Sequence, residues 1–439
     1  MNRRDFLSSL IAAPAVVAAP KTALNVIVIL ADDLGWGELG CYGNQFNETP
    51  NLDRLARQGV RFTQAYSASP VCSPMRASYM TGQYPARVGI NDYLRADDPN
   101  HLSPEYESLP KQFVRAGYET ALVGKWHLMG DYRTRKGDPK LHGFKQVICS
   151  ESSYIGPGYY YPPYQHMKEV QPRKPGEYLT DRLNQEAVEF LERTAGRPFY
   201  LTLNHYAPHT TLSGKPELVA KYKAKPGAAV KKNNPELAAM LESIDEGVGQ
   251  IVSALDRLKI ADRTLVMFAS DNGGETNVTT NAHLRGGKSQ LYEGGIRVPL
   301  IVRAPNIRAP GRTSQEPVSS IDFYPTLLDA AGATAAPKHR VDGRSFLKAV
   351  MEPSPKPTPR PLFWYYPLDK PHFLGGRSAA AIRKGDLKLI EFFDTHTVEL
   401  YNLKADEAES HDLAASAPER VSELRAELDN WRTATVKKV

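Results

Sequence analysis

The chain has few cysteines, no long apolar run after its N-terminus and no block of basic residues. Its 439 residues include three cysteines, an odd number that does not form a disulfide framework, although Cys41 and Cys149 could pair. No later segment approaches the roughly 20 apolar residues of a membrane-spanning helix, so no permanent membrane anchor is expected. Without a basic block or an aromatic RNA-binding motif, nucleic acid is not an expected partner.

The composition is that of a globular protein with a large core. Apolar residues make up 41% and charged residues 24% of the chain, and its length favours one large and one smaller domain. The formal charge of +6 permits anionic partners such as sulfated polymers. A mild excess of this size is equally typical of an ordinary solvated surface.

The first residues resemble an export signal. Two arginines at positions 3 and 4 precede Phe6 and an Ala/Val-rich apolar segment, residues 11–19, that ends in a plausible cleavage site. This order predicts a twin-arginine-like signal over residues 1–19, and hence a bacterial protein exported to the periplasm or beyond the cell. An ordinary hydrophobic first helix is the alternative.

Four apolar, β-rich runs end in polar residues, and they alternate with amphipathic helical stretches. The runs and the polar residues after them are 24–30 with Asp32 and Asp33, 119–123 with Lys125 and His127, 199–203 with His205 and His209, and 264–269 with Asp271 and Asn272. The alternation predicts an α/β fold with a mostly parallel sheet covered by helices. Because ligands bind outside the carboxyl ends of such strands, we expect the four clusters to converge on one crevice.

The two acidic clusters favour a hard divalent cation. Asp32, Asp33, Asp271 and Asn272 offer only oxygen ligands, which suit Ca²⁺ or Mg²⁺ and not zinc. Either pair alone could be a helix cap or a turn. Several carboxylates at neighbouring strand ends would repel one another without a cation, so the sequence predicts a metal site.

Cys72 has a context that is unusual for a structural cysteine. Ser73 is a good helix N-cap and Pro74 a good first helical residue, so Cys72 is expected just outside the positive end of a short helix, where anions are attracted. The alternative is a small buried apolar residue, which is the usual environment of a lone cysteine.

Six motifs together resemble the sulfatase family, over a stretch from Val26 to about Asp412. They are Cys72-Ser73-Pro74-Met75-Arg76 with the helix that ends in Thr81-Gly82, Asp32-Asp33-Leu34-Gly35, Gly124-Lys125-Trp126-His127, Ala207-Pro208-His209, Asp271-Asn272-Gly273 and residues 285–299 around Lys288. One departure is Met75, where many members have Ser. The resemblance implies an alkaline-phosphatase-like α/β/α sandwich, followed by a small C-terminal antiparallel sheet with a helix.

The resemblance also implies a modified nucleophile and a metal. A formylglycine-generating maturation enzyme would oxidise Cys72 to formylglycine (3-oxoalanine), whose hydrate attacks the sulfate ester. Calcium, or less favourably magnesium, would be held by Asp32, Asp33, Asp271, Asn272 and residue 72.

The basic residues of these motifs take the remaining roles that the resemblance implies. Arg76 would hold the formylglycine oxygens, and Lys125 and Lys288 would neutralise the sulfate. His127 would take the proton that expels sulfate from residue 72, while His209 would protonate the leaving alcohol.

A proline-rich segment, residues 352–361, is predicted to be a linker, because prolines stiffen linkers and oppose helices. It would join a catalytic domain, residues 22–351, to a C-terminal subdomain, residues 362–439. Residues 154–178 are rich in Tyr and Pro and could stack on sugar rings or form a plain surface loop. For His205 we expect a core histidine or a residue behind the site.

The expected function is therefore hydrolysis of sulfate esters by an exported, calcium-dependent enzyme. The charge balance and the Tyr-rich loop favour sulfated carbohydrate, with small aryl sulfates as the other possible substrates. A phosphoesterase or phosphonate hydrolase of the same superfamily is an alternative, but it would more often show His/Asp ligands for a second metal. A second alternative is a non-catalytic protein that binds sulfated polysaccharide.

Overall fold

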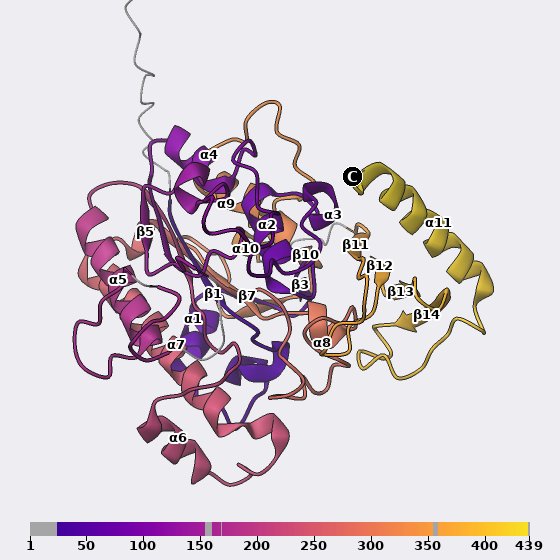
Figure 1. Cartoon of the computed structure of the whole chain (residues 1–439), viewed down its shortest axis with the longest axis horizontal. Helices are drawn as coiled ribbons and strands as arrows, with labels where there is room; N and C mark the ends of the chain where they lie inside the picture. The colour runs from indigo at the N-terminus through magenta and orange to yellow at the C-terminus, as the bar shows by residue number, and fades with distance from the viewer. Residues whose placement is uncertain (1–23, 154–159, 168, 354–358, 438–439) are drawn as a thin grey trace, which may run out of the picture.

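The computed structural model describes residues 24–153, 160–167, 169–353 and 359–437. These residues form a large α/β domain with a smaller sheet beside it (Figure 1). The predicted export signal lies outside the described residues, as does part of the predicted linker. Among the described helices, none combines the length and the apolar character that crossing a membrane requires.

An eight-stranded sheet forms the centre of the large domain, with the strand order β5-β4-β6-β1-β7-β8-β2-β9. The neighbours from β5 to β7 are parallel, whereas β8 runs against both of its neighbours. The mostly parallel sheet predicted from the sequence is confirmed. The strands are β1 Asn25–Ala31, β2 Val60–Phe62, β4 Glu119–Gly124, β5 Gln146–Ile148, β6 Phe199–Asn204, β7 Thr264–Ser270, β8 Leu300–Arg303 and β9 Arg312–Ser314.

Strand β1 lies in the middle of this sheet because both of its faces are apolar. Successive side chains of a strand point to opposite faces. Val26, Val28 and Leu30 pack into one hydrophobic cluster, while Ile27 and Ile29 pack into another on the opposite face. A run that is apolar at every position therefore suits a strand covered on both sides.

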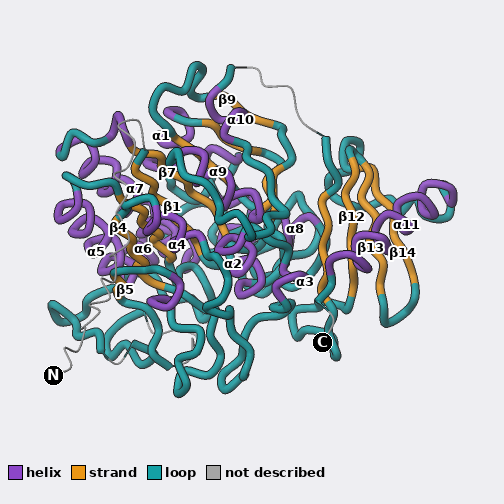
Figure 2. Tube along the Cα trace, turned by 90° about the horizontal axis from the view of Figure 1, so that it is seen from above, coloured by secondary structure: helices purple, strands orange, loops and turns teal. Residues whose placement is uncertain are grey.

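Helices cover both faces of the sheet (Figure 2). On one side lie α1 Pro50–Gln58, α5 Leu179–Thr194 and α7 Pro235–Arg257, with α6 Pro216–Lys223 packed on α7. On the other lie α2 Cys72–Thr81, α3 Pro85–Val88, α4 Leu109–Arg115, α9 Phe323–Ala330 and α10 Leu347–Met351. The long helix α7 has a favourable start, since the Asn234 side chain accepts a hydrogen bond from the backbone N–H of Glu236 at 3.0 Å and Pro235 is its first residue.

The C-terminal part is a four-stranded antiparallel sheet in chain order, and the small sheet with a helix expected from the sequence is confirmed. One face packs on the large domain, where Trp364 and Ile390 meet Tyr66 and Ile296. The other face is covered by α11. The elements are β11 Leu362–Tyr366, β12 Ala379–Lys384, β13 Leu387–Phe392, β14 Thr397–Asn402 and α11 Pro418–Thr435. Two short strands, β3 Ala65–Tyr66 and β10 Val318–Ser319, pair in parallel within the large domain.

Buried charges fix the small sheet to the large domain. The Lys388 ammonium of β13 lies 3.0 Å from a Glu293 oxygen and 2.8 Å from a Glu409 oxygen, and all three side chains are fully buried. Glu293 opens the short helix α8, Glu293–Ile296, directly after the segment that carries Lys288. Burial raises the pKa of Glu409 to about 7, although the Lys388 ammonium opposes this shift.

Replacing Lys388 with methionine should lower the free energy of unfolding by about 3–5 kcal/mol at pH 8, because the buried Glu409 carboxylate would lose its ion-pair partner. The matched control is Lys384→Met at the end of β12. Lys384 pairs with Glu423 and Glu427 at the surface, where such pairs are worth less than about 1 kcal/mol. Urea unfolding of both variants measures the difference, and equal losses would contradict the role assigned to the buried cluster.

Candidate functional site

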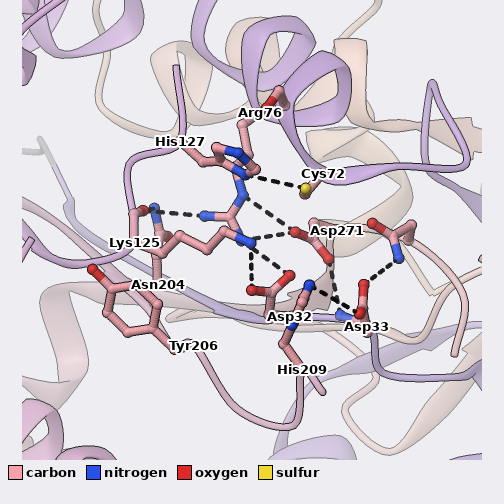
Figure 3. A network of polar contacts seen from close by, with 12 residues as sticks. Asp32, Asp33, Cys72, Arg76, Lys125, His127, Asn204, Tyr206, His209 and Asp271 are labelled. Carbon is pink, nitrogen blue, oxygen red and sulfur yellow. Dashed lines mark hydrogen bonds and ion pairs between the residues drawn. The ribbon is translucent and has the colours of Figure 1, made fainter. Parts of the chain in front are cut away.

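Four adjacent strands bring the predicted site residues to one edge of the sheet. β4, β6, β1 and β7 are neighbours and run parallel, so their carboxyl ends lie side by side. Around this edge the structure brings together Asp32, Asp33, Cys72, Arg76, Lys125, His127, His209, Asp271, Asn272 and Lys288, most of which Figure 3 labels.

Helix α2 begins at Cys72 itself, two residues earlier than expected, with Val71 rather than Ser73 as its N-cap. Ser73 does not cap the helix: its hydroxyl accepts a hydrogen bond from the backbone N–H of Leu94 at 3.0 Å. Cys72 is only 2% exposed. Burial raises the pKa of its thiol to about 11, partly offset by Lys125 and Lys288, so the unmodified side chain is a protonated thiol at neutral pH.

His127 presents one ring nitrogen to Cys72. Its Nδ1 lies 3.2 Å from the Cys72 sulfur, and its Nε2 lies 2.9 Å from the Leu94 carbonyl oxygen. Because a carbonyl can only accept, Nε2 carries the proton and the Nδ1 lone pair faces residue 72. Burial lowers the pKa of His127 well below its usual value, and the Lys125 ammonium adds to the effect. This imidazole is therefore neutral at neutral pH.

Glu151, which the sequence analysis did not single out, binds the backbone of this histidine and of the residue before it. Its two carboxylate oxygens accept the backbone N–H of His127 at 2.6 Å and that of Trp126 at 3.1 Å, and the Tyr206 hydroxyl donates to it at 2.9 Å. His127 has a left-handed backbone, φ 54°, which is uncommon for a residue other than glycine. Glu151 stabilises that backbone. No motif in the Ser-Glu-Ser-Ser segment around Glu151 predicts this role.

Each aspartate of the site pairs with a basic side chain from another segment. The pairs are Asp32 with Lys125 at 2.5 Å, Asp271 with Arg76 at 2.7 Å and Asp33 with Lys288 at 2.7 Å. The sequence argument that these carboxylates would repel one another without a metal is therefore wrong in its premise. That argument assigned the aspartates to a bound cation and the basic side chains to a bound anion. In the structure the aspartates pair directly with Lys125, Arg76 and Lys288.

Two oxygens of the site nevertheless fit a cation. Asp32 Oδ1 and Asn272 Oδ1 are buried and accept no hydrogen bond from the described residues, which is costly for a polar atom. Ligand atoms of Asp32, Asp33 and His209 also lie within 4.8 Å of one another. A donor set dominated by oxygen fits Ca²⁺ or Mg²⁺.

The two histidines after β6 have different environments. The His209 side chain is 26% exposed, and its Nε2 lies 3.0 Å from the Lys288 ammonium and 3.6 Å from Asp33. His205 is fully buried, with Nε2 at 2.8 Å from Asn184 of α5, and burial lowers its pKa to about 3. His209 therefore belongs to the crevice, whereas His205 is a core histidine.

Three tyrosines of the Tyr-rich stretch are buried and are not available to stack on a sugar ring, whereas Tyr161 is partly buried. Tyr160, Tyr164 and Tyr178 are buried in the core on the α5 side of the sheet. The Tyr160 hydroxyl donates to the His209 carbonyl oxygen at 2.8 Å. The Tyr160 side chain therefore supports the segment that carries His209. Residues 154–159 of the stretch lie outside the described residues.

The fold and this crevice define a hydrolase of the alkaline-phosphatase-like α/β class. Residues 24–333 match the Sulfatase family, and residues 285–434 match the family described as N-sulphoglucosamine sulphohydrolase, C-terminal. The chain belongs to the sulfatase family and is a sulfuric ester hydrolase, as the sequence motifs predicted.

Relatives from animals and bacteria agree with this assignment. The chain is 32% identical to mouse (Mus musculus) steryl-sulfatase, over 77% of this chain and 66% of the relative. It is 31% identical to a sulfatase of Formosa agariphila, over 92% of this chain and 87% of the relative. It is also 32% identical to N-acetylgalactosamine-6-sulfatase of Canis lupus familiaris, over 78% of this chain and 68% of the relative.

Solved structures share the whole architecture. Ps i-CgsB is 31% identical with a TM-score of 0.81, covering 94% of this chain and 93% of its own, and it has also been solved in complex with k-i-k-neocarrahexaose. The phosphonate monoester hydrolase of Agrobacterium radiobacter is 21% identical with a TM-score of 0.68, covering 92% of this chain and 96% of its own. That second likeness concerns the fold alone.

Proposed function

We propose that this protein hydrolyses sulfate esters of carbohydrates, with residue 72 acting as formylglycine beside a bound calcium ion. The observation that carries the proposal is the pairing of residue 72 with the neutral Nδ1 of His127 at 3.2 Å, in a buried crevice that also holds Arg76, Lys125 and Lys288. Oxidised by a maturation enzyme and hydrated, residue 72 would supply the hydroxyl that attacks sulfur.

The three basic side chains would stabilise the charge of the sulfate and of residue 72. Arg76, Lys125 and Lys288 are all more than nine-tenths buried, and fixed charges in a buried site act more strongly than in water. Arg76 would hold oxygens on residue 72, while Lys125 and Lys288 would face the sulfate oxygens. Calcium, or less favourably magnesium, held by Asp32, Asp33, Asp271, Asn272 and residue 72 would add positive charge there.

Two histidines would move protons on opposite sides of the sulfur. The Nδ1 of His127 accepts a proton from residue 72, which promotes release of sulfate, and Leu94 keeps the ring in the required tautomer. His209 lies at the exposed end of the crevice, beside Lys288. It would donate a proton to the leaving alcohol, which departs toward solvent.

Two of the named relatives support a carbohydrate substrate, whereas the steryl-sulfatase does not. One is an N-acetylgalactosamine-6-sulfatase, and Ps i-CgsB has been solved with an oligosaccharide. Residues 1–19 would direct export by the twin-arginine route, to the periplasm or beyond the cell. The mature chain would comprise a catalytic domain, residues 22–351, a linker, residues 352–361, and a C-terminal subdomain, residues 362–439.

The nucleophile is tested by Cys72→Ala, which should abolish hydrolysis and leave the melting temperature within a few degrees of the parent. The neighbouring Ser73 hydroxyl is bound to the Leu94 backbone and cannot replace the attacking group. Cys41→Ala is the matched control and should keep full activity. Mass spectrometry of the peptide across residue 72 should find the aldehyde in the parent protein, and activity of Cys72→Ala within a few-fold of the parent would refute the proposal.

The metal site is tested by the increase in melting temperature that added Ca²⁺ causes, since a ligand that binds only the folded state stabilises it. Chelator-treated parent protein should lose turnover, and Ca²⁺ should restore both turnover and melting temperature. Asn272→Ala removes an oxygen that accepts no hydrogen bond from the described residues, so it should reduce the Ca²⁺-induced increase. Asp245→Asn, on α7, should keep it. An increase that is the same in all three proteins would exclude this site, and a parallel titration with Mg²⁺ ranks the two ions.

The acid role of His209 is tested by leaving-group dependence. His209→Ala should slow hydrolysis of esters with poorly acidic alcohols by roughly 10²–10⁴. Activated aryl sulfates should be affected far less, because their alcohols leave without protonation. The ratio of kcat/KM for the two kinds of ester is the measurement, and an equal loss for both would remove His209 from this role.

A further inference from the structure

A loop of the small sheet lies against the segment that carries Lys288. It is the β11–β12 connection, residues 367–378, and the Gln290 amide donates a hydrogen bond to its Leu374 carbonyl oxygen at 2.9 Å. A Cβ at Gly376 would overlap the Ser289 carbonyl oxygen, so only glycine permits this close approach. The loop is thus held directly beside the crevice.

A second segment comes to the same place from the large domain. The backbone of Leu94 binds two neighbours of Cys72. Its N–H donates a hydrogen bond to the Ser73 hydroxyl at 3.0 Å, and its carbonyl oxygen lies 2.9 Å from His127 Nε2. Tyr93 and Arg95 flank Leu94 in the chain. Their positions are therefore fixed relative to residue 72.

The two segments meet where one guanidinium group and three aromatic rings pack in series. The Arg95 guanidinium lies 4.2 Å from the Tyr93 ring centroid, the Tyr93 ring packs edge-on against His372 at 5.6 Å, and His372 stacks on Phe373 at 4.3 Å. We call these four residues the aromatic rim. Burial lowers the pKa of His372; Asp92 opposes this shift, and the Lys288 and Arg95 side chains add to it.

Phe373 is the outermost member of the aromatic rim. It is 78% exposed, whereas His372 behind it is 8% exposed. Single exposed apolar side chains are ordinary on protein surfaces. Among the large apolar side chains exposed in the described part of the chain, however, Phe373 is the most exposed and the one aromatic, the others being Val114, Leu141 and Val230. Its ring is packed on His372 beside a catalytic crevice.

We propose that the aromatic rim binds the sugar ring next to the one that carries the scissile sulfate. This proposal rests on the proposed function and assigns the substrate more narrowly, to oligosaccharides. The free surface of Phe373 offers apolar contact to the C–H face of a pyranose. Arg95 pairs with Asp92 at 2.8 Å and still has N–H donors for hydroxyl or sulfate oxygens of that ring. A small aryl sulfate would fill the crevice without reaching the rim.

Binding of k-i-k-neocarrahexaose, measured by calorimetry in a Cys72→Ala background that cannot turn it over, tests the rim. Phe373→Ala should weaken binding by about tenfold, the loss expected for one stacked ring. Phe373→Trp should restore affinity to within a few-fold of the parent, and the matched control Val114→Ala should not change it. Equal affinity with and without Phe373, or no binding to the parent, would overturn the proposal.

A second measurement, with Cys72 intact, separates substrate binding from a structural role. Phe373→Ala should leave kcat/KM for 4-nitrophenyl sulfate unchanged, because that ester does not reach the rim, and an equal loss on this ester would refute the proposal. If the parent cleaves no sulfate ester but binds the hexaose through Phe373, the proposed function fails and the rim stands only as an oligosaccharide-binding surface. If the parent cleaves sulfate esters but binds the hexaose independently of Phe373, the rim fails and the proposed function stands.

Discussion

Three buried ion pairs at the carboxyl edge of the sheet are the interactions on which the site depends. They join segments that are far apart in the chain. Two of the pairs connect the end of β1 with the end of β4 and with the loop that carries Lys288. The third pair connects the end of β7 with α2. Burying six charged groups is unfavourable unless each is paired, and losing one partner leaves a desolvated charge behind. In the proposed function the same side chains would supply positive charge to a sulfate and oxygen ligands to a cation. Stability and chemistry thus draw on one set of side chains.

Backbone geometry allows these charges to converge. Lys125 follows Gly124, which has φ 93° and lies so close to the Asn204 carbonyl oxygen that a Cβ there would overlap it. Two residues later His127 adopts a left-handed backbone without being glycine, a conformation that costs of order 1–3 kcal/mol unless its surroundings stabilise it. Glu151 provides that support by accepting two consecutive backbone N–H groups. Removing Glu151 should therefore act on His127 rather than on Lys125 and Lys288.

The sequence predicts most of the fold and the positions of the site residues, because both depend on local patterns. Apolar runs that stop at Asp32, Lys125 and Asp271 mark the ends of parallel strands of one sheet, and a shared edge follows from topology. What it does not predict depends on tertiary contacts. Helix α2 begins two residues early, and the Ser73 hydroxyl that was expected to cap it accepts a hydrogen bond from the Leu94 backbone instead. The three ion pairs and the hydrogen bonds of Glu151 connect residues that are far apart in the chain. No periodic pattern or motif in the sequence indicates that these residues meet.

The small sheet is coupled to the site through the segment that it contacts. Lys388 fixes α8, which follows directly on the Lys288 segment, and the β11–β12 loop packs on Ser289 and Gln290 of that segment. The Ser289 N–H in turn donates to the Pro70 carbonyl oxygen at 2.8 Å, two residues before Cys72. Docking of the small sheet therefore positions Lys288 together with His372 and Phe373 of the aromatic rim. Since the rim side chains take no part in the three ion pairs, substitutions in the β11–β12 loop would change the proposed sugar contact and leave the charged groups of the crevice in place.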